Sequence, residues 1–341
     1  MTAEPTARQH PGLDLDVLTP WFVENVGAVS GQLNAELIAG GKSNLTYRLY
    51  DDQQRWILRR PPVGKLLATA HDMGREYTMM SALASTDVPV PVMYALGDAE
   101  LLGAPFYVME AVDGTPYRKA SELAELGPER TRAISERLVD TLAVLHQVEP
   151  AQVGLGDFGH PEGFLARQVA RWRKQFDAAH TRDLPAMERL HALLAEQVPP
   201  DAAPGIVHGD YRLDNVLVDD SDQPRAVLDW ELSTIGDSLT DLALMSVYHR
   251  MGAAGGGVTD VAVAPGFLSD EEVVARYAAA SGRDLTNFGF YVAYSCFKLA
   301  GIVEGIHYRF TNGQTVGDGF ADVGATVEPL LQAGLAALKE N

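Results

Sequence analysis

Only one cysteine, Cys296, occurs among the 341 residues, so the chain cannot form an internal disulfide bond. No uninterrupted apolar run reaches the roughly 18 residues expected of a membrane-spanning helix. The opening segment, MTAEPTARQHPGLD, is polar and lacks the apolar stretch of a secretory signal. These absences predict a cytoplasmic protein with no membrane partner.

Basic residues are also few compared with acidic ones. The 27 Lys and Arg side chains are outnumbered by 46 Asp and Glu, which gives a formal net charge of −19. Such a surface repels phosphate backbones and argues against a nucleic-acid partner. It favours solubility and would suit a cationic small molecule, but diffuse charge identifies neither a ligand nor an oligomeric state. An anionic ligand would need local Arg, Lys or metal ions.

Apolar residues make up 46% of the sequence, which is enough for a core. The length exceeds that of one typical compact domain and predicts two lobes. Short apolar runs between turns indicate strands in the first third, whereas helical spacing dominates from residue 130 onward. Ahead of these, residues 1–13 are expected to form a tail. Thr19 followed by Pro20 predicts a helix start, with Thr19 as the N-cap.

The densest group of polar side chains lies in residues 206–243, which begin IVHGDYRLDNVLVDDSDQPRAVLDW. The apolar runs predict two short strands joined by a polar turn, with Asp210, Asn215 and Asp229 at their edges. Two carboxylates and an amide oxygen could bind a hard divalent cation, which prefers oxygen ligands. One carboxylate would then remain to act as a base.

This stretch resembles the catalytic loop and metal-binding segment of the aminoglycoside phosphotransferase and choline kinase-like family. Four residues separate Asp210 from Asn215, as in the kinase catalytic loop. Asp229-Trp230 stands where protein kinases carry Asp-Phe-Gly, although Glu231 replaces the glycine. The motif is specific because several positions agree together.

The resemblance implies an α+β, two-lobed protein-kinase-like fold. A small N-terminal antiparallel sheet lobe, residues 1–110, would bind nucleotide. A larger, mainly helical C-terminal lobe, residues 111–341, would carry the catalytic and substrate-binding groups. The segments GGKSNLTY, LRRPP and HGDYRLDN are most similar to the phosphotransferase branch related to the kinase-like domain of acyl-CoA dehydrogenase fusions. That branch does not imply an aminoglycoside substrate.

By the same resemblance, a turn between two early strands would cover the phosphates of ATP, with Gly41, Ser43 and Asn44 as binding residues. Glycines let backbone amides approach an anion, and Ser and Asn add side-chain donors. Taken alone, a Gly-Gly turn is most often only a hairpin connection. The backbone of Glu110 and Ala111, after a later strand, would bind the adenine edge, although a plain strand exit has the same pattern.

Arg59 aligns with the phosphate-pairing lysine of protein kinases, and Glu76, in a helix expected over residues 71–84, would pair with it. Strand alternation sends Arg59 and Arg60 to opposite faces, so only one of them should point into the cleft. An arginine stays charged and can bind phosphate through a fork of donors. The alternatives are two solvated arginines and an ordinary exposed helix carboxylate.

The activity implied is Mg²⁺-dependent transfer of the γ-phosphate of ATP to a hydroxyl group of a small molecule. Asp210 would take the hydroxyl proton, while Asn215 and Asp229 would hold Mg²⁺. Arg212 would stabilise the transferring phosphate. His208 is expected to hold the loop through hydrogen bonds rather than to react.

The main alternative is a catalytically inactive, kinase-like nucleotide-binding module. Such a module would not need Asp210, Asn215 and Asp229 together, and ATP turnover distinguishes the two hypotheses. A transition-metal site or hydrolase dyad at His208 is disfavoured, because no second His or Cys lies nearby at ligand spacing and no Gly-x-Ser-x-Gly elbow is present. Downstream, Asp241 is expected to brace the catalytic loop.

Overall fold

The computed structural model describes residues 9–40, 44–63, 72–255, 259–314 and 322–339. The chain divides into two compact units, Met1–Thr115 with Leu217–Ser233 and Pro116–Val216 with Thr234–Asn341. The functional lobes expected for residues 1–110 and 111–341 remain a prediction. Within the described ranges, none of the helices combines the length and the apolar character that crossing a membrane requires.

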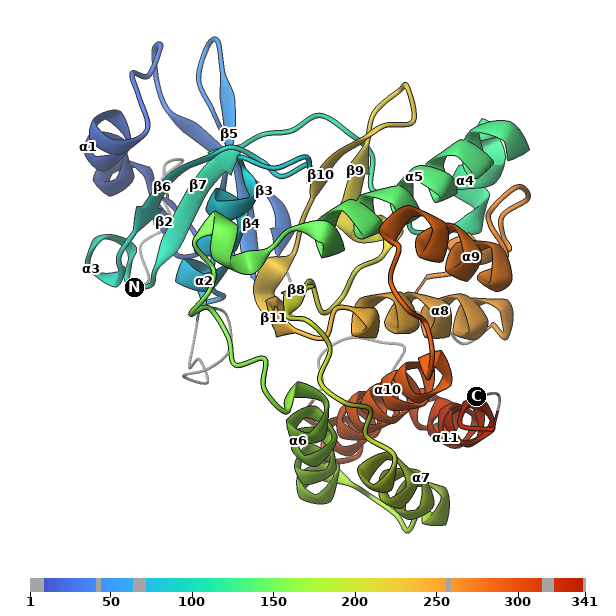
Figure 1. The fold of residues 1–341 in the computed structure, drawn as a ribbon. Coiled ribbons are helices and arrows are strands. Elements are labelled where there is room, and N and C mark those ends of the chain that lie inside the picture. Colours follow the sequence, from blue (N-terminus) through green and yellow to red (C-terminus); the bar gives the residue numbers. More distant parts are fainter. Residues whose placement is uncertain (1–8, 41–43, 64–71, 256–258, 315–321, 340–341) are drawn as a thin grey trace. The chain divides into compact units, whose positions relative to one another are not determined.

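The first unit is built on a five-stranded antiparallel sheet with the strand order β3-β4-β5-β7-β6 (Figure 1). The strands are β3 Asn34–Gly40, β4 Leu45–Tyr50, β5 Arg55–Arg60, β6 Met93–Gly97 and β7 Phe106–Glu110. Two short pairs accompany the sheet, β1 Gln9–His10 with β2 Leu13–Asp14 and β9 Val216–Val218 with β10 Pro224–Val227. The unit also contains the helices α1 Leu15–Asn25, α2 Met73–Leu83 and α3 Ala99–Leu102 and the 3-10 turn η3 Trp230–Leu232.

Burial alternates along β4 and shows which face of the sheet covers the core of this unit. Leu45, Tyr47 and Leu49 are buried, whereas the residues between them are not. This is the period of two expected for a sheet that covers a core with one face. On the helix side, Phe22 of α1 meets Trp56 of β5 edge to face, with ring centroids 4.9 Å apart.

The start of α1 differs from the sequence prediction. The N-cap is Asp14, whose carboxylate accepts hydrogen bonds from the backbone amides of Asp16 at 2.9 Å and Val17 at 3.4 Å. Thr19 and Pro20 therefore lie inside the helix rather than at its start. Asp caps a helix as well as Thr does, and here the earlier residue has the amides within reach.

The tail predicted for residues 1–13 is wrong over its last part. Residues 9–10 and 13–14 pair as the antiparallel strands β1 and β2. Leu13 is buried with the core of the first unit. An apolar side chain within a polar segment was the signal for this anchoring.

The second unit is mainly helical. Its helices are α4 Ala120–Leu126, α5 Pro128–Gln147, α6 Phe164–Ala179, α7 Pro185–Glu196, α8 Leu239–Ala253, α9 Asp270–Ser281, α10 Phe288–Thr311 and α11 Val327–Ala337. A short antiparallel pair joins β8 Gly205–Val207 to β11 Thr234–Gly236. With the antiparallel sheet of the first unit, this confirms the predicted α+β class.

Helices α8 and α10 form the centre of the second unit. Helix α10 packs against α6, α8 and α11. Every residue of helix α8 from Leu239 to His249 is buried, as expected of a helix enclosed by others. Asp241 and Tyr248 are polar side chains of this buried stretch, and each has a hydrogen-bond partner.

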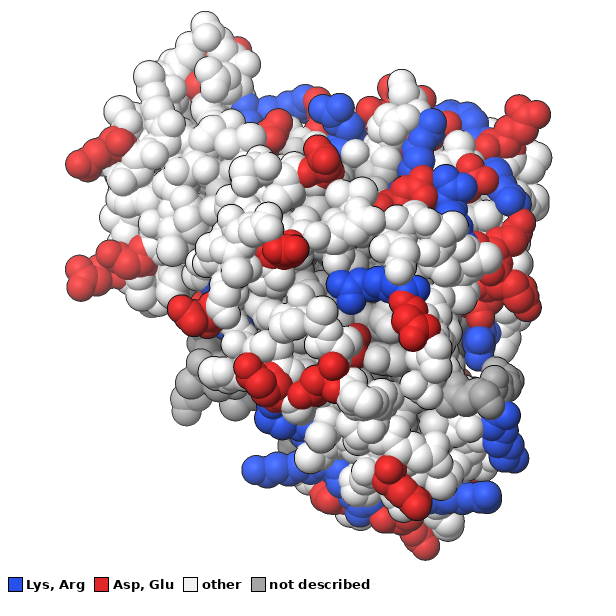
Figure 2. Space-filling view, viewed as in Figure 1, with Lys and Arg blue, Asp and Glu red and all other residues white. Residues whose placement is uncertain are grey.

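Acidic and basic side chains are interspersed on the face of the molecule seen in Figure 2. Basic side chains form no continuous surface on that face. Several arginines pair with carboxylates, as Arg276 does with Asp140 at 2.7 Å and Arg132 with Glu272 at 2.8 Å. Pairs of this kind leave little uncompensated positive charge for a polyanion.

Candidate active site

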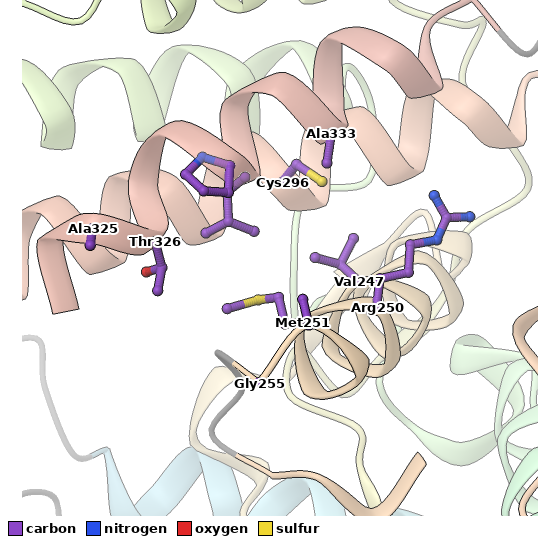
Figure 3. Close-up of a pocket in the computed structure, with 11 residues that line it drawn as sticks. Val247, Arg250, Met251, Gly255, Cys296, Ala325, Thr326 and Ala333 are labelled. Carbon is purple, nitrogen blue, oxygen red and sulfur yellow. The ribbon is translucent and has the colours of Figure 1, made fainter. Parts of the chain in front are cut away.

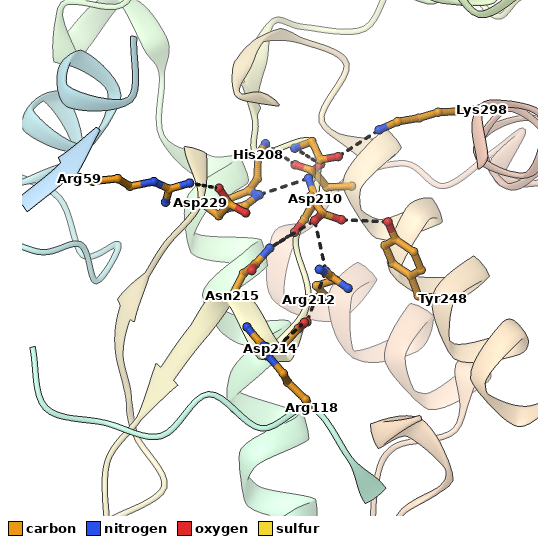
Figure 4. Close-up of polar contacts among 12 residues, drawn as sticks. Arg59, Arg118, His208, Asp210, Arg212, Asp214, Asn215, Asp229, Tyr248 and Lys298 are labelled. Carbon is orange, nitrogen blue, oxygen red and sulfur yellow. Dashed lines mark hydrogen bonds and ion pairs between the residues drawn. The ribbon is translucent and has the colours of Figure 1, made fainter. Parts of the chain in front are cut away.

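In the first unit, an ion-pair cluster forms around Arg59 of β5. Its Nη2 donates to Asp229 Oδ1 at 2.6 Å, and its Nη1 lies 3.5 Å from Glu76 Oε2 (Figure 4 shows the pair with Asp229). The same oxygen of Glu76 accepts a 3.0 Å hydrogen bond from the hydroxyl of Tyr107. The pair expected between Arg59 and Glu76 is therefore present, while its role towards a nucleotide remains a prediction.

The neighbouring Arg60 has different partners. Its guanidinium donates to the backbone carbonyls of Gly12 and of Leu102, the latter at 3.1 Å. The side chain is buried among these carbonyl groups. Of the two arginines, Arg59 is the one that joins the carboxylates, as strand alternation required of one of them.

The charges of this cluster are strongly coupled. Burial raises the pKa of Glu76, although the charge of Arg59 opposes the change. Burial also works against the charge of Arg59, but Tyr107, Glu76 and Asp229 outweigh it and raise the pKa of the guanidinium. Arg59 therefore remains a cation, which is the form that can bind phosphate. The second oxygen of Glu76, Oε1, has no hydrogen-bond partner among the described residues.

Asp229 has an unusual backbone conformation. It follows β10 with φ 67° and ψ 59°, in the left-handed region. A non-glycine residue there costs about 1–3 kcal/mol, and such residues cluster at functional sites. Asp is one of the side chains that tolerate this conformation. The buried ring of the next residue, Trp230, anchors the turn through Nε1, which donates to Val227 O at 2.9 Å.

The turn predicted to cover the phosphates is only partly described. Gly41 and Ser43 lie outside the described residues. Asn44 is buried, and its Nδ2 donates to Glu231 Oε2 at 3.3 Å. Glu231 is the residue that replaces the glycine of the kinase motif, and sequence reasoning gave it no such partner.

Glu110 lies at the end of β7, as expected for the segment that would bind adenine. Its backbone amide donates to Val92 O at 2.8 Å, and its carboxylate accepts from Val92 N at 3.2 Å. These bonds tie Glu110 to the residue just before β6. Ala111 follows directly after the strand.

In the second unit, the proposed base Asp210 lies in the loop between β8 and the 3-10 turn η2 Leu213–Asn215. Both of its carboxylate oxygens are occupied (Figure 4). Oδ1 accepts from the Tyr248 hydroxyl at 2.9 Å, and Oδ2 accepts from Arg212 Nε at 3.2 Å. Asn215 Nδ2 donates to Asp210 O at 2.9 Å and lies 3.4 Å from Oδ2.

The side chain of Asn215 is oriented by these bonds. Because Nδ2 faces Asp210, the amide oxygen is the atom that Asn215 can offer to a cation. An amide oxygen, as on Asn215 of the second unit, and a carboxylate, as on Asp229 of the first, are both ligand types that Mg²⁺ accepts beside waters and phosphate oxygens. Within the described ranges, no group of three or more His, Cys, Asp or Glu could hold a metal ion by itself. That Asn215 and Asp229 hold one metal ion stays a prediction.

Arg212 has more than one partner. Its Nε lies 3.3 Å from Asp214 Oδ1 as well as near Asp210, and its guanidinium carbon lies 5.5 Å from the centre of the Tyr248 ring. Its Nη1 is buried and has no hydrogen-bond partner in the described part of the chain. A guanidinium nitrogen of this kind is suited to an incoming anion.

A buried carboxylate on α8 fixes the backbone of the catalytic loop. Asp241 accepts hydrogen bonds from the amides of His208 at 2.6 Å and Gly209 at 2.7 Å, and His146 Nε2 lies 3.3 Å away. Burial disfavours its charge, but His146 and His208 outweigh this and lower the pKa of Asp241. The brace predicted for Asp241 is confirmed, and His146 extends it to the hydroxyl of Tyr277 at 2.6 Å.

Two further side chains reach the loop from helices far along the sequence. Lys298 of α10 donates from Nζ to Gly209 O at 3.0 Å, and Tyr248 of α8 holds Asp210 (Figure 4). Neither contact was predicted. The available signal was a polar side chain within an apolar helix, which indicates a buried partner without identifying it.

A cavity of about 400 Å³ lies elsewhere in the second unit, between α8, α10, α11 and the 3-10 turn η5 Val323–Thr326 (Figure 3). Its walls are mainly apolar, with Val247, Met251, Cys296, Thr326, Leu330 and Ala333 among them. None of the residues that contact Asp210 lines it. It is therefore separate from the catalytic loop.

Comparison with solved structures defines the class of protein. A crystal structure from Ralstonia eutropha JMP134, provisionally described as an aminoglycoside phosphotransferase, matches with a TM-score of 0.85 and 33% identity over 96% of this chain and 98% of that one. The aminoglycoside phosphotransferase APH(4)-Ia, in a complex with AMP-PNP and hygromycin B, has the same fold at a TM-score of 0.62 and 16% identity over 93% of this chain and 97% of its own. The fold is that of the kinase-like phosphotransferases, which confirms the two-lobed architecture predicted.

The chain belongs to the phosphotransferase enzyme family, whose sequence model matches residues 34–288. It is also 36% identical to acyl-CoA dehydrogenase family member 11 of Gallus gallus over 321 residues, and 36% identical to the Homo sapiens protein of that name over 309 residues. These matches cover 91% and 88% of this chain but 41% and 39% of the two relatives, so the chain spans about two fifths of their length. The resemblance drawn from the sequence motifs is confirmed.

Proposed function

We propose that the protein transfers the γ-phosphate of ATP to a hydroxyl group of a small molecule. The observation that carries the proposal is the ordered carboxylate of Asp210, on a loop fixed by Asp241, in a chain of the phosphotransferase enzyme family. A carboxylate held in this way can accept a proton from a hydroxyl group.

In this mechanism, Asp210 takes the proton as the acceptor oxygen attacks the γ-phosphorus, and the bond to ADP breaks. Arg212 offers its unpaired guanidinium nitrogen to the negative charge on the transferring group. Arg59, kept cationic by its carboxylate neighbours, binds the phosphates. Asn215 and Asp229 would hold Mg²⁺, whose charge offsets that of the phosphates.

The remaining assigned residues would position ATP. Gly41, Ser43 and Asn44 would cover its phosphates, Glu76 would hold Arg59, and Glu110 with Ala111 would bind the adenine edge. These roles are carried over from the family motif.

The decisive experiment is ATP consumption with Mg²⁺ over a panel of hydroxyl compounds, comprising aminoglycosides, macrolides, amino alcohols, sugars and hydroxyacyl compounds. We expect Asp210→Ala to lower transfer by about 100-fold or more, the usual contribution of a general base, with Mg·ATP binding largely intact. Asp157→Ala, which removes an exposed carboxylate of the same unit, is the control and should keep full activity.

Wild-type rates in the Asp210→Ala protein would show that the base is assigned wrongly. Binding of ATP without turnover, with every class of acceptor, would favour the alternative of a catalytically inactive nucleotide-binding module.

A further inference from the structure

The two oxygens of the Asp210 carboxylate have partners of different kinds. Oδ1 accepts from a neutral phenol, Tyr248, at 2.9 Å. Oδ2 accepts from a cation, Arg212, at 3.2 Å, and a second donor, Asn215 Nδ2, lies 3.4 Å from it. Each carboxylate oxygen has two lone pairs, and both of those on Oδ2 face donors, so Oδ2 can take the proton of the acceptor hydroxyl only after one of its donors is exchanged.

Arg212 is the partner that can be exchanged. Its side chain is long and flexible, and its Nε also lies near a second carboxylate, that of Asp214. Its Nη1 has no hydrogen-bond partner among the described residues. Because a phosphate is an anion, its arrival would attract this guanidinium away from Asp210.

Tyr248 is the partner that stays in place. It projects from α8, a helix enclosed on all sides, and only 9% of its surface is exposed. Its ring has two rotatable bonds and packs against Arg212, whose guanidinium carbon is 5.5 Å from the ring centre. Moving the hydroxyl away from Asp210 would require repacking the interior.

We propose that Tyr248 is the positioning residue of the reaction, because its hydroxyl holds Asp210 Oδ1 and thereby directs Oδ2 to the acceptor hydroxyl once Arg212 turns to the transferring phosphate. The hydroxyl O–H bond breaks and its proton passes to Oδ2. The acceptor oxygen bonds to the γ-phosphorus of ATP, and ADP departs with the electrons of the broken P–O bond. This inference rests on the proposed function, since it assigns Asp210 as the base.

The phenol itself does not compete for the proton. Burial and the adjacent Asp210 charge both raise the pKa of Tyr248, so it stays protonated and remains a donor. Its position in the sequence, 38 residues after Asp210, hides the contact from any local motif.

The test is Tyr248→Phe, which removes the hydroxyl and keeps the ring that packs on Arg212. We expect kcat to fall about tenfold or more, as for the loss of a hydrogen bond to a charged group, while KM for Mg·ATP stays unchanged. A residue that only filled space would leave kcat as it was, because the ring is retained.

The chain offers a matched control in Tyr291→Phe. Tyr291 of α10 donates to Asp237 Oδ2 at 2.6 Å, which is the same bond between the same residue types away from the catalytic loop. This variant should lose stability without the selective fall in kcat. If Tyr248→Phe does not fold, two other variants are compared. Tyr248→Gln keeps a hydrogen-bond donor and must have a higher kcat than Tyr248→Leu, which has none.

Unchanged kcat in Tyr248→Phe, or equal falls in Tyr248→Phe and Tyr291→Phe, would overturn the inference. Either result would leave the proposed function standing if Asp210→Ala still lowered transfer by about 100-fold or more. Failure of the proposed function itself would show as ATP binding by the wild-type protein without turnover with every class of acceptor.

Discussion

The backbone amide of Gly209 donates a 2.7 Å hydrogen bond to Oδ1 of Asp241, a residue 32 positions further along the chain. Gly209 has φ 89°, a conformation that side-chain-bearing residues rarely adopt. The adjacent amide of His208 donates to the other oxygen of the same carboxylate. The geometry of the loop before Asp210 is thus set by one buried acid from another element.

Asp241→Asn should therefore lower both stability and turnover. The side-chain amide of Asn can accept from one backbone N–H, but its NH₂ group would face the other N–H donor. We therefore expect the free energy of unfolding to fall by about 2 kcal/mol, which is the scale of a hydrogen bond to a charged group. Urea unfolding and kcat, measured side by side, check this. Asp157→Asn serves as the exposed control, and equal stability of the two variants would contradict the assigned brace.

Asp229→Asn should remove the part of ATP-induced thermal stabilisation that depends on Mg²⁺. A ligand at 100 times its Kd stabilises a protein by about 2.7 kcal/mol, so the loss is measurable by thermal shift with ATP, with and without Mg²⁺. Asp222 has φ 63° on the exposed turn after β9, so Asp222→Asn controls for the backbone conformation. An Mg²⁺-dependent shift of unchanged size in Asp229→Asn would refute its role as a ligand.

Lys298→Met should slow turnover with little change in stability. The variant removes the bond from Nζ to Gly209 O, yet it also removes a buried ammonium whose pKa burial lowers despite Asp210 and Asp241. For stability, the loss of the hydrogen bond and the removal of the buried charge offset each other. The catalytic loop nevertheless loses the bond that holds Gly209 O, so kcat should fall by about tenfold. Lys174→Met on α6, an exposed lysine, is the control, and matching kcat values for the two variants would count against the support.

The buried His249 should make the folded protein less stable in acid. Burial lowers its pKa to about 4, opposed by Asp270 of α9, and its ring packs edge-on against Phe267 at 5.3 Å. Because the folded state disfavours the charged form, the stabilisation is complete above the unfolded pKa, near 6.5, and is lost as the pH falls towards 4. Between pH 7.5 and 5 this amounts to about 2 kcal/mol of unfolding free energy.

His249→Leu should unfold with less dependence on pH over that range than the wild type. Urea unfolding at both pH values measures the difference. His160→Leu, which replaces an exposed histidine, should keep the wild-type dependence. An identical slope in all three proteins would show that another group is responsible.

Local patterns predicted much of the fold. The strands β4 and β5, the helix that carries Glu76, and the short strands around Asp210 and Asp229 follow from short apolar runs, helical spacing and turn residues. The first residue of α1 could not be predicted in this way, because Asp14 and Thr19 are both good N-cap residues. Which of them caps the helix depends on the backbone amides that the folded chain brings near it.

The candidate site was predictable only where its residues belong to one motif. Asp210, Arg212 and Asn215 lie in one short loop, so their spacing identified them. Tyr248 and Lys298 reach that loop through the packing of α8 and α10, which depends on the whole helical unit. Contacts between elements distant in sequence leave no local trace in a single chain.

The solitary cysteine gives this protein a practical use in spectroscopy. Cys296 is 1% exposed, and burial raises the pKa of its thiol to about 12, so it should resist alkylation in the native state. Cysteines introduced at exposed positions, such as Gln53 in the first unit and Gln175 in the second, could therefore be labelled with a donor and an acceptor dye without altering the native thiol. Energy transfer between the dyes would then report the separation of the two units in solution, with and without nucleotide.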